Sequence, residues 1–171
     1  MIKPVGQGSA LGVRFAASEG EVPEALVAAF SYDDRVLLER YVEGRELAVS
    51  VLGSEPLPTV EAVPREEDFF NFEARYEIGR TEYVCPAELD DERAAAVSDA
   101  ATRTYEALGC SGFARVDLIL AADGPWVLEA NAIPGLTDTS LLPQAAEAAD
   151  LSFEDLVSRI LDLALKPAAL S

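Results

Sequence analysis

Apolar residues alternate with polar ones, or form short runs, in several stretches that have the length of strands. They predict strands at residues 1–4, 13–16, 35–42, 45–53, 58–64, 112–120 and 126–131. Glu43-Gly44 predicts a tight hairpin between the third and fourth of these strands. The stretch AADGP predicts a turn between the last two.

Three other stretches have helical spacing, at residues 21–33, 89–109 and 152–165. Gly109 is expected to end the second helix, and Ser152 is expected to cap the start of the third. Antiparallel hairpins beside a few helices indicate an α+β fold with a largely antiparallel sheet flanked by helices. The order of elements is not the βαβα alternation of dinucleotide-binding domains. A stretch without a clear period, 65–80, is expected to be a loop.

The last two predicted strands carry polar residues at positions that are expected to meet. With a three-residue turn centred on Asp123, Asp117 falls opposite Glu129, and Arg115 falls opposite Asn131. Residues two apart share one face of a strand, so these four side chains are expected on one face. The alignment depends on the register, because a slip of one residue would remove it.

Two carboxylates that face each other on a sheet are destabilising unless a cation lies between them. Asp117, Glu129 and Asn131 supply the carboxylate and amide oxygens that suit Mg²⁺. Arg115 would lie beside the ion, where it is placed to stabilise anionic charge. The alternative is that the charges are solvated at a strand edge. The presence of RVD and EAN in adjacent strands favours the metal site.

The composition limits the possible partners and chemistry. The chain has 171 residues, half of them apolar, with 31 acidic and 13 basic residues and a formal net charge of −18. This charge argues against a nucleic-acid partner, since phosphate binding needs Lys and Arg. The absence of histidine excludes His-based triads and His-ligated zinc. Cys85 and Cys110 are expected to be free thiols, and no apolar run is long enough to span a membrane. We therefore expect a cytoplasmic location.

A glycine-rich loop at residues 5–12 presents backbone N–H groups that suit an anion, and Lys3 lies at its entrance. The loop lacks the Gly-Lys-Ser/Thr ending of a Walker motif. On their own, Glu39 and Glu46 would be read as solvated surface charges.

Taken together, the chain resembles the ATP-grasp superfamily and, within it, the D-alanine–D-alanine ligases. The matching stretches are KPVGQGSALGV (3–13), VLLERYVEGRELAVSVLG (36–53), NFEARYEIG (71–79), YEALGCSGFARVDLIL (105–120) and LEANAIPGLTDTSLLP (128–143). They cover most of the chain. The combination of ARVD, EAN followed by PG, and TSLLP is specific to the dipeptide ligases.

The resemblance implies an activity and a role for each matching residue. In the family, ATP phosphorylates the carboxylate of one D-alanine, and the amine of a second attacks the acylphosphate to give a cell-wall dipeptide. Asp117, Glu129 and Asn131 would then ligate two Mg²⁺ ions, with Mn²⁺ as a possible substitute, while Arg115 would stabilise the tetrahedral oxygen. The implied ATP-binding residues are Lys3, Glu39, Arg40, Tyr41, Val42, Glu46 and Arg75.

The implied roles extend to catalysis and to the second substrate. Ser9 would help to order the active-site flap, and Tyr76 belongs to the flap itself. The second D-alanine would be bound by Gly135, Ser140 and Leu141.

Three departures from the family pattern stand out. Ala10 replaces a serine of the phosphate loop, and Arg75-Tyr76 replaces the usual Lys-Tyr pair of the flap. The chain also starts at the KP motif, so the N-terminal domain and most of the central lobe are expected to be absent. The resemblance therefore implies the C-terminal part of an ATP-grasp ligase, residues 1–171, which forms no dipeptide alone.

Two other functions remain open from the sequence. One is a nucleotide-binding module that another polypeptide completes. The other is an ATP-grasp ligase for a different carboxylate and amine, although TDTSLLP favours D-alanine. A homodimer is compatible with the full-length enzymes of the family.

Overall fold

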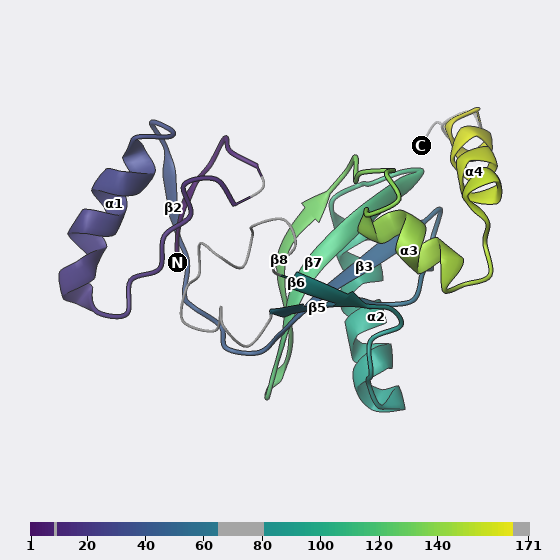
Figure 1. The fold of residues 1–171 in the computed structure, drawn as a ribbon, viewed down its shortest axis with the longest axis horizontal. Coiled ribbons are helices and arrows are strands. Elements are labelled where there is room, and N and C mark those ends of the chain that lie inside the picture. The colour runs from purple at the N-terminus through teal and green to yellow at the C-terminus, as the bar shows by residue number, and fades with distance from the viewer. Residues whose placement is uncertain (9, 65–80, 166–171) are drawn as a thin grey trace. The chain divides into compact units, whose positions relative to one another are not determined.

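The computed structural model describes residues 1–8, 10–64 and 81–165. The chain divides into two compact units, residues 1–42 with 64–82 and residues 43–63 with 83–171. Figure 1 shows the order of the elements along the chain.

The first unit contains a small antiparallel sheet and one α-helix in its described residues. Strand β1 (Ile2–Pro4) pairs with β2 (Val36–Leu38) so that Lys3 lies opposite Leu37. A single 3-10 turn, η1 (Glu19–Glu21), leads into α1 (Val22–Phe30), which has a proline in its first turn. Ile2 packs against Ala25 and Ala29 of the helix, and these three residues form a small buried core in this unit.

The second unit is built on an antiparallel sheet whose strand order is β6-β5-β3-β7-β8. The strands are β3 (Arg45–Leu52), β5 (Val60–Pro64), β6 (Thr81–Val84), β7 (Phe113–Ala121) and β8 (Gly124–Asn131). The short β4 (Glu55–Pro56) also pairs with β3. Because β3 pairs with β7 along its whole length, these two strands form the centre of the sheet.

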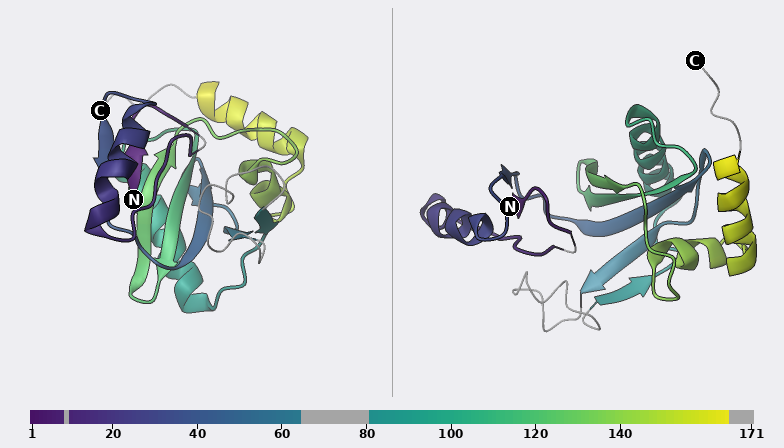
Figure 2. Two further views of the ribbon diagram at one scale, coloured as in Figure 1. Left: turned by 60° about the vertical axis from the view of Figure 1, so that its left-hand side comes forward. Right: turned by 90° about the horizontal axis from the view of Figure 1, so that it is seen from above.

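One face of this sheet is covered by α2 (Asp91–Ala107) (Figure 2). Along β7 every second residue from Ala114 to Leu120 is buried, which is the alternation expected when only one face packs on a helix. The helix contributes Val97, Ala101 and Tyr105 to this core. Its start is capped by the side chain of Asp90, which accepts the N–H of Arg93.

The opposite face is covered in part by α3 (Leu141–Glu147) and α4 (Phe153–Leu165) (Figure 2). Leu142 of α3 and Leu156 of α4 are fully buried against Ala48 and Leu52 of β3. The hydroxyl of Ser152 accepts the N–H of Asp155, which confirms its predicted role as a helix cap.

Most predicted elements are present, but two predictions at the start of the chain are wrong. Residues 13–16 form a single bridge, between Arg14 and Ile2, and not a strand. The hairpin at Glu43-Gly44 does not exist, since β2 pairs with β1 whereas β3 pairs with β4, β5 and β7.

Gly44 was interpreted from the sequence as a turn residue, but in the structure it is required by close packing. A β-carbon on Gly44 would lie 2.4 Å from the backbone oxygen of Leu120, so only glycine fits there without a shift. Other elements went unpredicted: α3, β4 and β6. The predicted loop at 65–80 lies outside the described residues. None of the helices in the described ranges combines the length and apolar character that crossing a bilayer requires.

Candidate functional site

The predicted polar face on β7 and β8 is present, with the predicted partners. Asp117 lies opposite Glu129, and Arg115 lies opposite Asn131. Arg115 and Asp117 alternate along β7 with residues that are fully buried against α2, so their side chains project from the other face.

The reason for this register differs from the predicted one. The turn holds two residues, because Ala121 pairs with Gly124, and not the three that were predicted. The register then shifts between Asp117 and Leu118, since Leu118 pairs with Val127 and Asp117 pairs with Glu129. Leu128 is therefore an extra residue in β8, which makes this a β-bulge.

The bulge decides which way the end of β8 points. Trp126, opposite Ile119, lies on the same face as Asp117. Regular alternation after Trp126 would place Glu129 and Asn131 on the opposite face, towards α2. One extra residue reverses this, so Glu129 and Asn131 lie on the face of Asp117.

Strand β3 extends this polar face on the other side of β7. Ala48 lies opposite Asp117 and Ser50 lies opposite Arg115. Glu46, opposite Ile119, is the next residue on this face of β3. The structure therefore brings the predicted ribose-binding glutamate onto the same sheet face as the predicted metal ligands.

Arg115 and Asp117 form a two-pronged ion pair within β7. The Nε and Nη2 atoms of Arg115 donate to the two carboxylate oxygens of Asp117 at 2.7 and 2.8 Å. Their side chains are only 20% and 21% exposed. The hydrogen bonds from Arg115 to Asp117 raise the pKa of the guanidinium, and the charges of Asp117 and Glu129 act in the same direction. Such a fork fixes both partners in position.

The donor set on this face fits a hard divalent cation. Asp117 and Glu129 are opposite each other and supply carboxylate oxygens, and Asn131 supplies an amide oxygen that also accepts the N–H of Ile133 at 3.1 Å. Within residues 1–8, 10–64 and 81–165, no group of three acidic, cysteine or histidine side chains is close enough to hold a metal. A cation here would therefore also use Asn131 and would complete its ligand set with water or with oxygens of a bound phosphate group.

The predicted second-substrate residues lie together between β8 and α3. Ser140 directly precedes α3, and Leu141 is the first residue of that helix. The Ser140 hydroxyl lies 2.8 Å from that of Thr137 and accepts the Thr137 N–H at 3.1 Å. A β-carbon on Gly135 would lie 2.6 Å from this hydroxyl, so the glycine leaves room for it.

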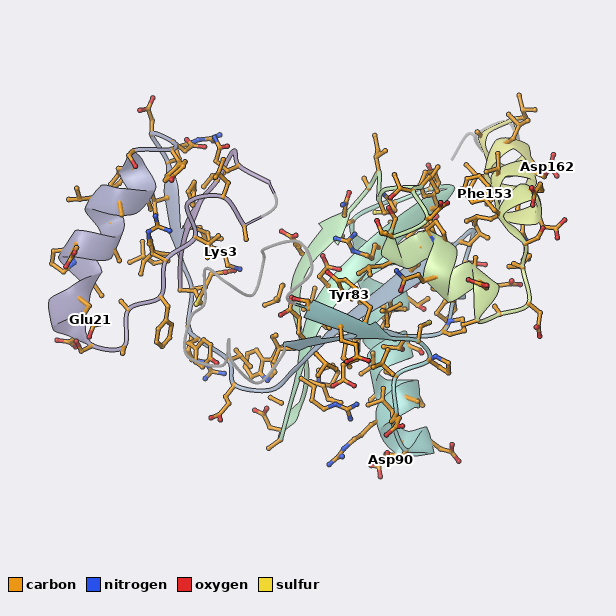
Figure 3. The ribbon with its side chains drawn as sticks, in the orientation of Figure 1. Lys3, Glu21, Tyr83, Asp90, Phe153 and Asp162 are labelled. Carbon is orange, nitrogen blue, oxygen red and sulfur yellow. The ribbon has the colours of Figure 1, made fainter. Side chains whose placement is uncertain are left out.

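In the first unit, two of the predicted ATP-binding residues contact each other. The amino group of Lys3, on β1, forms an ion pair with the carboxylate of Glu39 (Figure 3 labels Lys3). The backbone of Glu39 is held by the carbonyl of Met1. The ring of Tyr41 packs edge-on against that of Phe15, with centroids 5.0 Å apart.

Arg40 and Val42 lie on either side of Tyr41, in the segment between β2 and β3. Three further predicted site residues cannot be placed, because Ser9, Arg75 and Tyr76 lie outside the described residues.

Sequence reasoning missed several residues that shape these groups. Thr137 contacts the Ser140 hydroxyl; it lies within the TDTSLLP stretch, but the sequence assigned no role to it. Tyr83 of β6 is a further neighbour whose charge would raise the pKa of Arg115 (labelled in Figure 3). Ser50 is 1% exposed and lies opposite Arg115 in the neighbouring strand β3. It was missed because it stands in an apolar strand, where the sequence indicates only a core position.

Comparison with known proteins agrees with the resemblance. Residues 1–162 match the family model described as D-ala D-ala ligase C-terminus. The D-alanine–D-alanine ligase of Syntrophotalea carbinolica is 44% identical over 161 residues, which are 94% of this chain and 52% of that protein. The ligase of Anaeromyxobacter dehalogenans is 43% identical over 163 residues, which are 95% of this chain and 53% of that protein.

Solved structures of the same family have the same fold. The D-alanine–D-alanine ligase of Bacillus anthracis aligns with a TM-score of 0.82 at 32% identity, covering 96% of this chain and 54% of that one. The same enzyme complexed with ATP aligns with a TM-score of 0.77 at 30% identity, covering 96% and 50%. The chain spans about half the length of the curated relatives it matches. Its fold and its sequence show that it belongs to the family of D-alanine–D-alanine ligase C-terminal domains, which have the ATP-grasp fold.

Proposed function

We propose that this chain is the Mg-ATP-binding and second-substrate-binding part of a D-alanine–D-alanine ligase. The observation that carries the proposal is the shared face of Arg115, Asp117, Glu129 and Asn131, which a β-bulge creates. The bulge turns these two polar residues away from the face on which α2 packs and leaves Ala130 there. Bulges are over-represented next to active sites, where they change the direction of a side chain.

The oxygen donors would hold magnesium between the carboxylates and the ATP phosphates. Asp117, Glu129 and Asn131 are the ligands of two Mg²⁺ ions in this proposal, and Mn²⁺ has the same preference for oxygen. When bound, the ions neutralise negative charge on the transferring phosphoryl group.

Residues elsewhere in the chain would bind the rest of the nucleotide. Glu46 accepts hydrogen bonds from the ribose hydroxyls, and Lys3 contacts phosphate oxygens. The segment Glu39–Val42 contacts the adenine through its backbone and the Glu39 carboxylate. The homologous ligase of Bacillus anthracis, whose structure contains ATP, supports nucleotide binding by this chain.

The second substrate would lie near Ser140. The Ser140 hydroxyl and the Leu141 N–H donate to the carboxylate of a D-alanine, and the sequence LTDTSLLP supports this choice. Arg115 then lies where negative charge develops as the amine attacks the acylphosphate. Preorganised charge of this kind contributes about 3–4 kcal/mol to a transition state.

Calorimetric titration of the 171-residue chain with ATP, with and without Mg²⁺, tests the nucleotide and metal assignments. We expect binding that depends on Mg²⁺ and that is lost in Asp117→Asn and in Glu129→Gln. Asp123→Asn is the matched control, because it removes one negative charge from the turn of the same hairpin. Unchanged Mg-ATP binding in both site variants would exclude this metal site.

A further inference from the structure

Arg115 is hydrogen-bonded to both carboxylate oxygens of Asp117. The two prongs of the guanidinium contact both carboxylate oxygens, at 2.7 and 2.8 Å. A carboxylate held in this way offers a divalent cation only its remaining lone pairs. The pair is four-fifths shielded from solvent, so its charges interact more strongly than they would at the surface.

The charges around the pair show what the guanidinium does there. Asp117 faces Glu129 across the strands, and both contribute to the raised pKa of Arg115. The direct cross-strand neighbours of Arg115, Ser50 and Asn131, are uncharged. The guanidinium is therefore the cation that offsets two facing carboxylates, which is the role assigned above to a divalent ion.

We infer that Arg115 is an internal counter-ion that competes with the divalent cation for Asp117. This inference rests on the metal site of the proposed function and adds a sequence of events at that site. When the cation binds Asp117, the guanidinium leaves that carboxylate. It then becomes available to an anionic oxygen of the substrate.

Two other arginines near this sheet have carboxylate partners of their own. Arg45 is clamped to Glu61 at 2.5 and 2.7 Å and also donates to the Glu88 carbonyl. Arg159 of α4 pairs with Glu55 at 3.0 Å, where both side chains are largely exposed. Removal of Arg159 therefore changes the net charge by the same amount as removal of Arg115 and leaves the polar face intact.

Binding of Mn²⁺ without nucleotide, followed by electron paramagnetic resonance, tests the competition directly. We expect Arg115→Met to bind Mn²⁺ at least about tenfold more tightly than the unmodified chain, because the repulsion between the two cations is removed. Arg159→Met should stay close to the unmodified chain. Equal affinities of Arg115→Met and the unmodified chain would overturn the inference.

A second measurement uses the unmodified chain, so it does not depend on how well a variant folds. During titration with Mg²⁺, the nuclear magnetic resonance signal of the Arg115 Nε–H should shift and exchange faster with water. A signal that stays in place while those of Glu129 and Asn131 shift would overturn the inference and leave the metal site standing. Mn²⁺ binding that is unaffected by Asp117→Asn would instead remove the metal site, and the inference with it.

Discussion

Asp117 and Glu129 face each other because β8 contains one residue more than β7 between the turn and this pair. With the two-residue turn alone, Asp117 would lie opposite Leu128. The extra residue in β8, Leu128, shifts the pairing by one, so that Asp117 lies opposite Glu129. The turn and the bulge together place two carboxylates on one face. Neither of them does so alone.

Deletion of Leu128 alone should keep the candidate metal site. Glu129 then follows Val127 directly, so regular alternation still places Glu129 opposite Asp117 and Asn131 opposite Arg115. Deletion of Val127 together with Leu128 shifts the strand by one residue and turns Glu129 and Asn131 towards α2, so we expect this variant to lose Mn²⁺ binding. Equal Mn²⁺ affinity of the two deletion variants would show that the register of β8 does not orient these ligands.

The sequence predicted the polar face because polar residues interrupt apolar strands at a fixed spacing. Periodicity identified β7 and β8, and the facing of Asp117 and Glu129 followed from an assumed turn. The bulge could not be foreseen, since Leu128 looks like any other apolar strand residue. The predicted turn was one residue too long and the prediction contained no bulge, and these two errors cancelled at Asp117 and Glu129.

Other differences have a similar origin in tertiary contacts. Gly44 gives a strong local turn signal, but its cause is the close approach of Leu120. Helix α3 follows a stretch that reads as a polar loop, and its start depends on burial of Leu142 against the sheet. The contact between Thr137 and Ser140 is set by loop geometry, which no periodicity encodes.

Gly44→Ala should destabilise the second unit. The new β-carbon would lie 2.4 Å from the backbone oxygen of Leu120, which cannot rotate away as a side chain would. Overpacking of this kind costs about 1–3 kcal/mol, measured as the change in free energy of unfolding in urea. Gly20→Ala is the control, because its nearest contact is 3.9 Å away. Equal stability of the two variants would contradict the close packing.

Cys85 should make the stability of the chain fall at alkaline pH. Burial raises the pKa of this thiol above its ordinary value of 9.0. The folded state therefore holds its proton where the unfolded state has lost it, so stability is full below the unfolded pKa and declines as pH rises towards the folded one. Urea unfolding between about pH 8 and pH 10 should show a weaker decline in Cys85→Ala. An identical decline in Cys85→Ala would exclude this thiol as the cause.

Gly135→Ala should weaken binding of the second substrate without affecting ATP. The added β-carbon would lie 2.6 Å from the Ser140 hydroxyl, which must rotate and lose its contacts with Thr137. A lost hydrogen bond to a charged group costs about 1.5–3 kcal/mol, so KM for the second D-alanine should rise roughly tenfold or more. The measurement needs a complete ligase, such as this chain fused to the N-terminal half of the Syntrophotalea carbinolica enzyme. In that fusion KM for ATP should be unchanged, and Gly20→Ala should leave both constants unchanged. A rise in KM for ATP alone would place the Ser140 region at the nucleotide and not at the second substrate.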